Sequence, residues 1–360
     1  MPLPPSREAY DLIARYLCRW GTAALRLLPP ELSHELGLWL LERGLLNHLP
    51  MPEVGDLLNG LAIEVPGLGP LSHPIGLAAG FDKHARCPRA WAQLGFAFME
   101  IGTVTPRPQP GNAKPRIFRQ SSQLGLVNRM GFPSDGMSRV AERLKALRWV
   151  HDKVPLGLNL GKNKETADQH AVLDFIAGID TFSAMAKFFV INISSPNTPG
   201  LRGLANEEFL AQLQQRAPSS LSRMWIKLDP DMDKAKFQHI IGVIAKLGFA
   251  GVVLTNTHRV ERPETGGQSG HLLGVMSATR LEWAYEVHRG SLAMIASGGI
   301  LSGGDVFERL ARGAQAVEIY TALVYRGPWA VIDLLEELRE EMRLRGFGSV
   351  NEVVGSFYGA

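Results

Sequence analysis

The chain of 360 residues has little of several features that would narrow its class at once. It has only two cysteines, Cys18 and Cys87, too few for a disulfide framework or a cysteine-rich zinc site, which favours a reducing compartment. The sequence contains no run of 18 apolar residues, so it predicts no membrane-spanning helix. The N-terminus lacks the pattern of a secretory signal. The formal net charge of +3 is too small to indicate nucleic-acid binding.

Catalytic signatures of other enzyme classes are absent as well. There is no Gly-x-Ser-x-Gly elbow for a hydrolase serine and no His-Glu-x-x-His pair for a metalloprotease. The histidines form no ligand pair at helical spacing, so we predict no metal site. With 45% hydrophobic and 20% charged residues, the composition is that of an ordinary globular protein.

Residues 6–47 carry the pattern of two short helices that break at Pro29-Pro30. Apolar residues recur at three- and four-residue spacing and give each helix an apolar face. Two interpretations stay open. The helices either form a hairpin packed on the main domain, or they rest in a membrane interface, where Arg15, Arg19 and Arg26 would meet lipid headgroups.

From about residue 60, short apolar runs alternate with helical segments, and eight such runs predict a (β/α)₈ TIM barrel with an N-terminal two-helix extension. The runs show little polar alternation, as expected for strands buried on both faces. They are Pro74–Ala79, Phe98–Thr103, Leu156–Leu160, Phe188–Ile193, Trp225–Leu228, Gly251–Thr255, Met294–Ser297 and Ala316–Tyr320.

Polar residues or glycines stand at the C-terminal end of every run, which is the edge where such barrels build their active sites. Gly298-Gly299 and Tyr320-Thr321 follow the last two runs and predict a phosphate site, although a plain glycine turn is the simpler alternative. Lys227 lies within an apolar run and would need an anion. The Asn- and Pro-rich segment after Asn192 could bracket a planar amide ligand or could only form turns.

Taken together, these segments resemble the quinone-dependent (class 2) dihydroorotate dehydrogenases. The resemblance covers nearly the whole chain, and Pro30–Glu35 is similar to the helical extension of that family. The matching segments are Gly76–Lys83, Glu100–Asn112, Asn128–Phe132, Asn159–Lys164, Asn192–Arg202, Thr255–Thr257, Glu264–Gly270 and Tyr320–Pro328.

The resemblance implies an FMN enzyme of pyrimidine biosynthesis that oxidises dihydroorotate to orotate and passes the electrons to a membrane quinone. By motif, Ser195 would be the catalytic base that removes the C5 proton. Residues 1–50 would form the membrane and quinone-tunnel extension, residues 51–345 the FMN barrel and residues 346–360 a C-terminal tail. The protein would be a peripheral one on the cytoplasmic face of a bacterial inner membrane.

The same resemblance implies the remaining site residues. His34 and Arg116 would lie along the quinone tunnel. The substrate would meet Lys83, Asn128, Arg129, Met130, Gly131, Phe132, Asn192, Asn197, Asn256 and Thr257. FMN would meet Ala79, Gly80, Lys83, Thr103, Asn159, Asn192, Lys227, Thr255, Gly270, Gly299, Tyr320 and Thr321.

The sequence departs from the family pattern in several places. Asp229 replaces an alanine and would bring a carboxylate near Lys227, where it would make the flavin harder to reduce. Glu318 replaces a glutamine, and Ala296-Ser297 stands where the family has Gly-Val. Further departures are Lys187-Phe188, the segment His271–Leu273 and the shorter segments 198–226 and 258–264. Two alternatives therefore stay open: a divergent FMN oxidoreductase for another small ring substrate, and a non-catalytic flavin-bearing scaffold.

Overall fold

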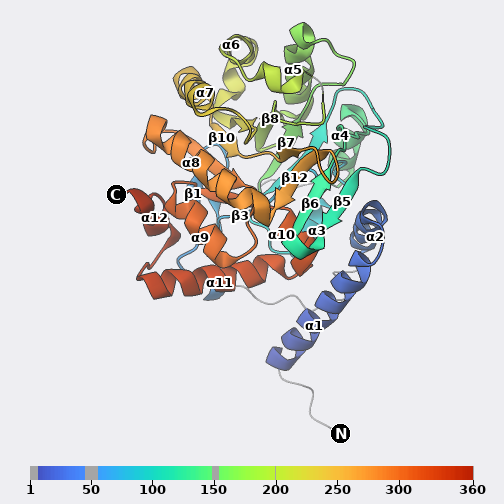
Figure 1. The fold of residues 1–360 in the computed structure, drawn as a ribbon, viewed down its shortest axis with the longest axis vertical. Coiled ribbons are helices and arrows are strands. Elements are labelled where there is room, and N and C mark those ends of the chain that lie inside the picture. The colour runs from blue at the N-terminus through green and yellow to red at the C-terminus, as the bar shows by residue number, and fades with distance from the viewer. Residues whose placement is uncertain (1–6, 45–55, 148–153, 199, 360) are drawn as a thin grey trace.

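The computed structural model describes residues 7–44, 56–147, 154–198 and 200–359. Eight parallel strands close into one barrel and follow one another around it in chain order, which confirms the predicted fold (Figure 1). They are β3 (Ile75–Leu77), β4 (Met99–Val104), β7 (Leu156–Leu160), β8 (Phe188–Asn192), β9 (Met224–Leu228), β10 (Gly251–Leu254), β13 (Ala293–Ser297) and β14 (Ala316–Ile319). The expected boundary between residues 50 and 51 lies outside the described residues.

Helices surround the barrel and connect its strands (Figure 1). Local signals set several of their ends. Ser302 and Asp305 form a capping box at the start of α9, and Gly248 ends α7 in the left-handed conformation. The helices are α3 (Pro88–Gln93), α4 (Met137–Ala146), α5 (Ala171–Phe182), α6 (Glu207–Arg216), α7 (Lys234–Leu247), α8 (Gly274–His288), α9 (Gly303–Ala311), α10 (Thr321–Arg326), α11 (Ala330–Arg345) and α12 (Val350–Val353).

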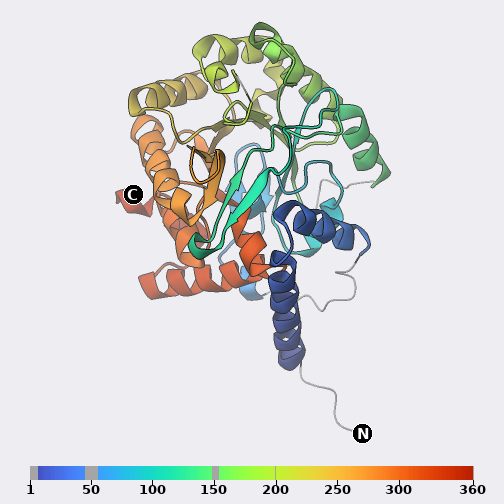
Figure 2. The ribbon, with the colours of Figure 1, turned by 45° about the vertical axis from the view of Figure 1, so that its right-hand side comes forward.

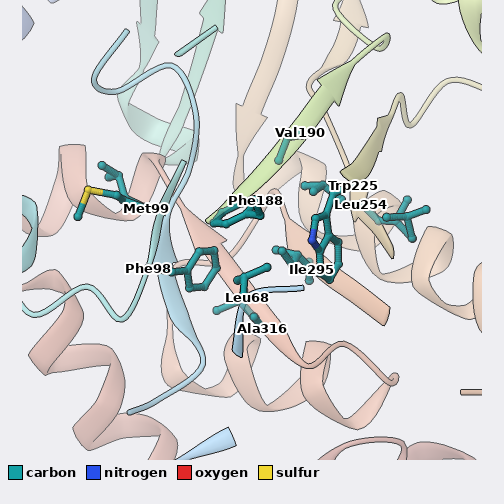
Figure 3. Close-up of a cluster of buried hydrophobic side chains, with 14 of the residues drawn as sticks. Leu68, Phe98, Met99, Phe188, Val190, Trp225, Leu254, Ile295 and Ala316 are labelled. Atoms are coloured by element: carbon teal, nitrogen blue, oxygen red, sulfur yellow. The ribbon is translucent and has the colours of Figure 1, made fainter. Parts of the chain in front are cut away.

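Large apolar side chains fill the part of the barrel that lies away from the C-terminal ends of the strands, so this part is a packed core and not a channel (Figure 3). Phe98 and Phe188 meet edge to face with ring centroids 6.2 Å apart. Leu68 packs beneath them from a short hairpin of β1 (Ile63–Val65) and β2 (Gly69–Leu71), and it is almost fully buried. Most polar side chains of the barrel strands therefore lie toward the other end of the strands.

A four-stranded antiparallel sheet lies at the C-terminal end of the barrel, and the sequence patterns did not predict it. Its strands are β5 (Ile117–Gln120), β6 (Gly125–Asn128), β11 (His258–Val260) and β12 (Gly266–Gly270), in the order β11-β12-β6-β5. Two insertions form it, one after β4 and one after β10. They bring Asn128 opposite Gly267 and give the rim an additional wall.

The two predicted N-terminal helices are present on one side of the barrel, where α1 extends beyond it (Figures 1 and 2). They are α1 (Arg7–Arg26) and α2 (Pro30–Glu42), and Pro30 occupies the first turn of α2, where a missing N–H costs nothing. Glu31 of α2 forms an ion pair of 3.0 Å with Arg116. Among the helices of the described residues, none is both long and apolar enough to cross a bilayer.

The arginines of α1 do not all face outward as the membrane interpretation expected. Arg15 contacts Glu336 at 2.6 Å, and Arg19 contacts Asp333 at 3.3 Å, both on α11. Arg26 stacks on the ring of Tyr325. These contacts hold α1 on the barrel because each cation finds a partner there, and they leave the apolar face of the helix outside.

Candidate active site

A cavity of about 1150 Å³, open solvent at its mouth included, lies at the C-terminal ends of the barrel strands. Its floor comes from the strand ends, and its walls come from the segment after β8 and from strands β6 and β12. This is the edge at which barrels of this fold bind their ligands.

The cavity brings together nearly all the site residues that the sequence indicated. The lining includes Ser195, Lys83, Asn128, Met130, Gly131, Phe132, Asn192, Asn197, Asn256, Thr257, Ala79, Gly80, Thr103, Lys227, Thr255, Gly270, Gly299, Tyr320 and Thr321. Arg129 does not line it, because its guanidinium turns to Glu264 and to the ring of Phe118. Asn159 lies behind the wall, where it contacts Thr103 and Asn192.

Ser195 lies on the segment that leaves β8 and is only 6% exposed. The backbone N–H of Asn197 donates to its Oγ at 3.2 Å, which fixes one side of the hydroxyl oxygen and favours negative charge on it. Arg202 holds the same segment by donating from Nε to the carbonyl of Ser194 at 3.2 Å. The hydroxyl is therefore both positioned and shielded from bulk water.

The asparagines form a connected hydrogen-bond network around the cavity. Asn197 donates to the backbone carbonyl of Asn128 at 3.2 Å. Asn256 donates to Ser194 Oγ at 2.9 Å, and Asn192 donates to Asn159 Oδ1 at 3.0 Å. Because each amide is oriented by a neighbour, the remaining donors and acceptors face the cavity in fixed directions.

Two lysines reach the cavity in different electrostatic settings. Lys83 donates to the carbonyl of Gly80, and burial lowers the pKa of its ammonium to about 8. Lys227 lies at the end of β9, and its Nζ is 3.0 Å from Glu100 Oε2 and 3.4 Å from Glu318 Oε2. Burial lowers the pKa of Lys227, but the two carboxyl groups outweigh it, and the pKa is raised overall.

Asp229 is not the carboxylate that contacts Lys227, contrary to the expectation from the sequence. It is buried, accepts the backbone N–H of Asp231 at 2.8 Å and lies 3.6 Å from Arg202 Nε. Burial raises the pKa of its carboxyl group. The carboxylates at Lys227 belong to Glu100 and Glu318. The sequence marks Glu318 as a departure from the family pattern but assigns no role to Glu100.

A glycine cradle adjoins Tyr320 and Thr321 in the cavity wall. Gly298 has φ +106° and Gly299 has φ +71°, and both are conformations that favour glycine. A Cβ on Gly298 would come within 2.6 Å of Leu273, and one on Gly299 within 2.2 Å of the Gly274 Cα. Because glycine has no side chain, the backbone N–H groups of such a turn can approach a phosphate group closely, which is the ligand that the sequence predicted.

A second, mostly apolar cavity of about 1380 Å³, open solvent included, lies between the N-terminal helices and the barrel. Ile117, Leu126 and Tyr320 line both cavities, so the two adjoin at these residues. His34 lines the second cavity and meets the ring of Phe81 with centroids 5.2 Å apart. Arg116 is not among the lining residues, since its guanidinium is held by Glu31 and by the carbonyl of Pro110.

The fold and this site define a class: a (β/α)₈-barrel protein whose cavity at the strand ends is lined by a glycine turn and by several asparagine amides. The comparisons with known proteins carry this further. The sequence model of the dihydroorotate dehydrogenase family matches residues 61–342, and the chain belongs to that family.

Relatives and solved structures agree with this assignment. The chain is 37% identical over 355 residues to the mitochondrial dihydroorotate dehydrogenase (quinone) of Mus musculus, covering 92% of this chain and 88% of the relative. It is 40% identical over 339 residues to the dihydroorotate dehydrogenase (quinone) of Acidithiobacillus ferrooxidans, covering 86% and 91%. The Eimeria tenella enzyme in complex with ferulenol superposes with a TM-score of 0.83 at 35% identity, covering 91% and 95%.

Proposed function

We propose that the protein is an FMN-dependent enzyme that oxidises dihydroorotate to orotate in pyrimidine biosynthesis and passes the electrons to a membrane quinone. The observation that carries the proposal is the pair of adjoining cavities. One holds Ser195 and the amide network, and the other is apolar, lies under the N-terminal helices and shares Tyr320 with the first. The relatives named as quinone-dependent enzymes favour this activity over another ring substrate or a scaffold.

The residues at the rim fit FMN. The cradle of Gly298, Gly299 and Thr321 suits a single phosphate, and Lys227 provides a cation for a ring that gains negative charge on reduction. Glu318 lines the same space, and its Oε1 is a buried oxygen without a hydrogen-bond partner among the described residues. Bound there, FMN would supply the acceptor for the hydride that leaves the substrate.

Ser195 would remove the proton from C5 of dihydroorotate. A serine hydroxyl is a weak base, so it needs a dry site and a donor that stabilises charge on its oxygen. The low exposure of Ser195 and the N–H of Asn197 meet both needs. Asn128, Asn192, Asn197 and Asn256 would hold the planar ring of the substrate through paired donors and acceptors.

The N-terminal helices would bring the second cavity to a lipid surface. Tyr16, Leu17 and Trp20 of α1 are all more than half exposed, and Leu17 also lines the apolar cavity. A quinone could therefore pass from the bilayer toward Tyr320 without crossing water. Through these helices the protein would attach peripherally to the cytoplasmic face of a bacterial inner membrane.

Anaerobic mixing with dihydroorotate tests the proposal. The released cofactor should have the mass of FMN, and the flavin absorbance should bleach in a single turnover. Ser195→Ala should slow this reduction by about 10²-fold or more, while the substrate still binds. Ser220→Ala is the matched control, since Ser220 is 7% exposed and does not line the cavity. Finding FAD, or unchanged reduction in Ser195→Ala, would contradict the proposal.

A further inference from the structure

Three ionisable side chains from three different strands meet inside the barrel beneath the cavity. Lys227 of β9 contacts Glu100 of β4 at 3.0 Å and Glu318 of β14 at 3.4 Å. All three side chains are buried, and both glutamates are at most 1% exposed. One ammonium therefore serves two buried carboxyl groups.

Glu100 and Glu318 both contact the single ammonium of Lys227, and each is therefore close to the other's negative charge. One ammonium cannot neutralise two carboxylates, so their repulsion makes one of them easier to protonate. Burial and the neighbouring Glu100 raise the pKa of Glu318 well above its usual value. Burial acts on Glu100 in the same direction, but Lys227 and Asn159 bring its pKa below the usual value. Of the two carboxyl groups, Glu318 is therefore the one that takes up a proton more readily.

The surroundings of Glu318 add no further charge among the described residues that face it. On the flanking strands it pairs with Gly76 of β3 and Ser297 of β13, neither of which titrates. Tyr320 follows on the same strand, and burial raises the pKa of its phenol to about 12, so it is neutral. The protonation of Glu318 thus depends on Glu100, on Lys227 and on whatever occupies the adjoining cavity.

We propose that the Glu318 carboxylate takes up a proton from solvent when FMN in this cavity is reduced, which makes Glu318 a redox-coupled proton acceptor. This inference rests on the proposed function. Reduction places negative charge beside Lys227, and a new negative charge makes a neighbouring carboxylate more basic. The step is balanced: the reductant supplies two electrons, one proton from the substrate hydride or from water would go to the cofactor, and a second proton from water forms the O–H bond of Glu318.

The pH dependence of the cofactor midpoint potential tests the proposal. In the pH interval where Glu318 is ionised in the oxidised protein and protonated in the reduced protein, cofactor reduction takes up one proton more in wild type than in Glu318→Gln. Each pH unit should therefore change the equilibrium constant for cofactor reduction by a further factor of ten in wild type. For a two-electron couple this tenfold factor corresponds to about 30 mV per pH unit. Glu318→Gln keeps the size of the side chain and mimics its neutral form, so FMN binding should persist.

Asp229→Asn is the matched control, because Asp229 is a buried carboxyl group that contacts Arg202 and not Lys227. Its potential should follow the wild-type pH profile. Infrared difference spectra, reduced minus oxidised, should show a gain in the carbonyl band of a neutral carboxylic acid in wild type and Asp229→Asn, but not in Glu318→Gln.

Parallel pH profiles in wild type and Glu318→Gln would overturn the inference, because Glu318 would then keep one protonation state throughout. An infrared band that persists in Glu318→Gln would overturn it as well. Dithionite serves as the reductant in both measurements, so the result does not depend on turnover of dihydroorotate. A protein that binds no FMN would instead refute the proposed function at the earlier mass measurement.

Discussion

The outward face of α1 allows a direct test of membrane attachment. Tyr16 and Trp20 lie four residues apart on one stripe and are 57% and 73% exposed. The contacts that hold the helix on the barrel come instead from Ala14, Cys18 and the ion pairs of Arg15 and Arg19. The double variant Tyr16→Ser/Trp20→Ser should therefore fold normally and lose affinity for lipid.

The loss can be sized from the exposed area. The two rings together present on the order of 250 Å² to the outside, of which about half would enter the acyl boundary. At about 25 cal/mol per Å² this burial contributes about 3 kcal/mol to binding. The partition coefficient should accordingly fall by about 100-fold. Salt should change it little, because Arg15 and Arg19 are occupied by acidic residues of α11.

Flotation with neutral phosphatidylcholine vesicles measures the partition coefficient directly. Val275→Ser/Leu344→Ser is the control, since these residues are 81% and 65% exposed on α8 and α11 and should not affect binding. Flavin reduction by dihydroorotate should be unchanged in both variants. Reoxidation by a long-tailed quinone in vesicles should slow only in the α1 variant. Equal partition of wild type and the α1 variant would refute the assignment of this face to lipid.

Two further predictions concern the barrel itself. Arg202→Met should release the segment that carries Ser195 and leave the buried Asp229 without its cation. The free energy of unfolding, measured by urea titration, should therefore fall by about 3 kcal/mol or more. An unchanged urea midpoint would contradict this prediction. His73 accepts the N–H of Ile75 on Nδ1, and burial lowers the pKa of His73 to about 4, against about 6.5 in an unfolded chain. The unfolded state therefore binds the additional proton, and stability should fall as the pH drops from about 6.5 toward about 4, less steeply in His73→Gln; parallel slopes would argue against it.

The barrel strands could be predicted because each is a short apolar run with polar residues at its end, and this pattern is local. The four-stranded sheet at the rim escaped prediction for the opposite reason. Its β12 reads Gly266-Gly-Gln-Ser-Gly270, which has neither apolar alternation nor β-branched residues. Backbone pairing with β6 and the packing of the rim hold it in place, and neither is visible in a single segment.

Long-range charge partners were the other limit of sequence analysis. The partners of Arg15 and Arg19 lie more than 300 residues away, so the sequence could not distinguish a docked arginine from one that meets lipid. Arg129 shares a motif with cavity residues, yet its side chain points toward Glu264. Glu100 did carry a usable signal, because a carboxylate in a strand buried on both faces must have a partner inside.

The buried carboxyl pair is connected to the substrate side of the cavity through oriented amides. Glu100 accepts from Asn159 Nδ2, so the Oδ1 atom of Asn159 is turned toward Asn192 and accepts its Nδ2 at 3.0 Å. Asn192 Oδ1 is then left to accept the hydroxyl of Ser194 at 3.2 Å, beside Ser195. A neutral Glu100 could donate its own proton and would allow Asn159 to turn over, which would disturb every amide after it. By taking the proton itself, Glu318 keeps Glu100 ionised and so keeps the amides around the substrate in one orientation.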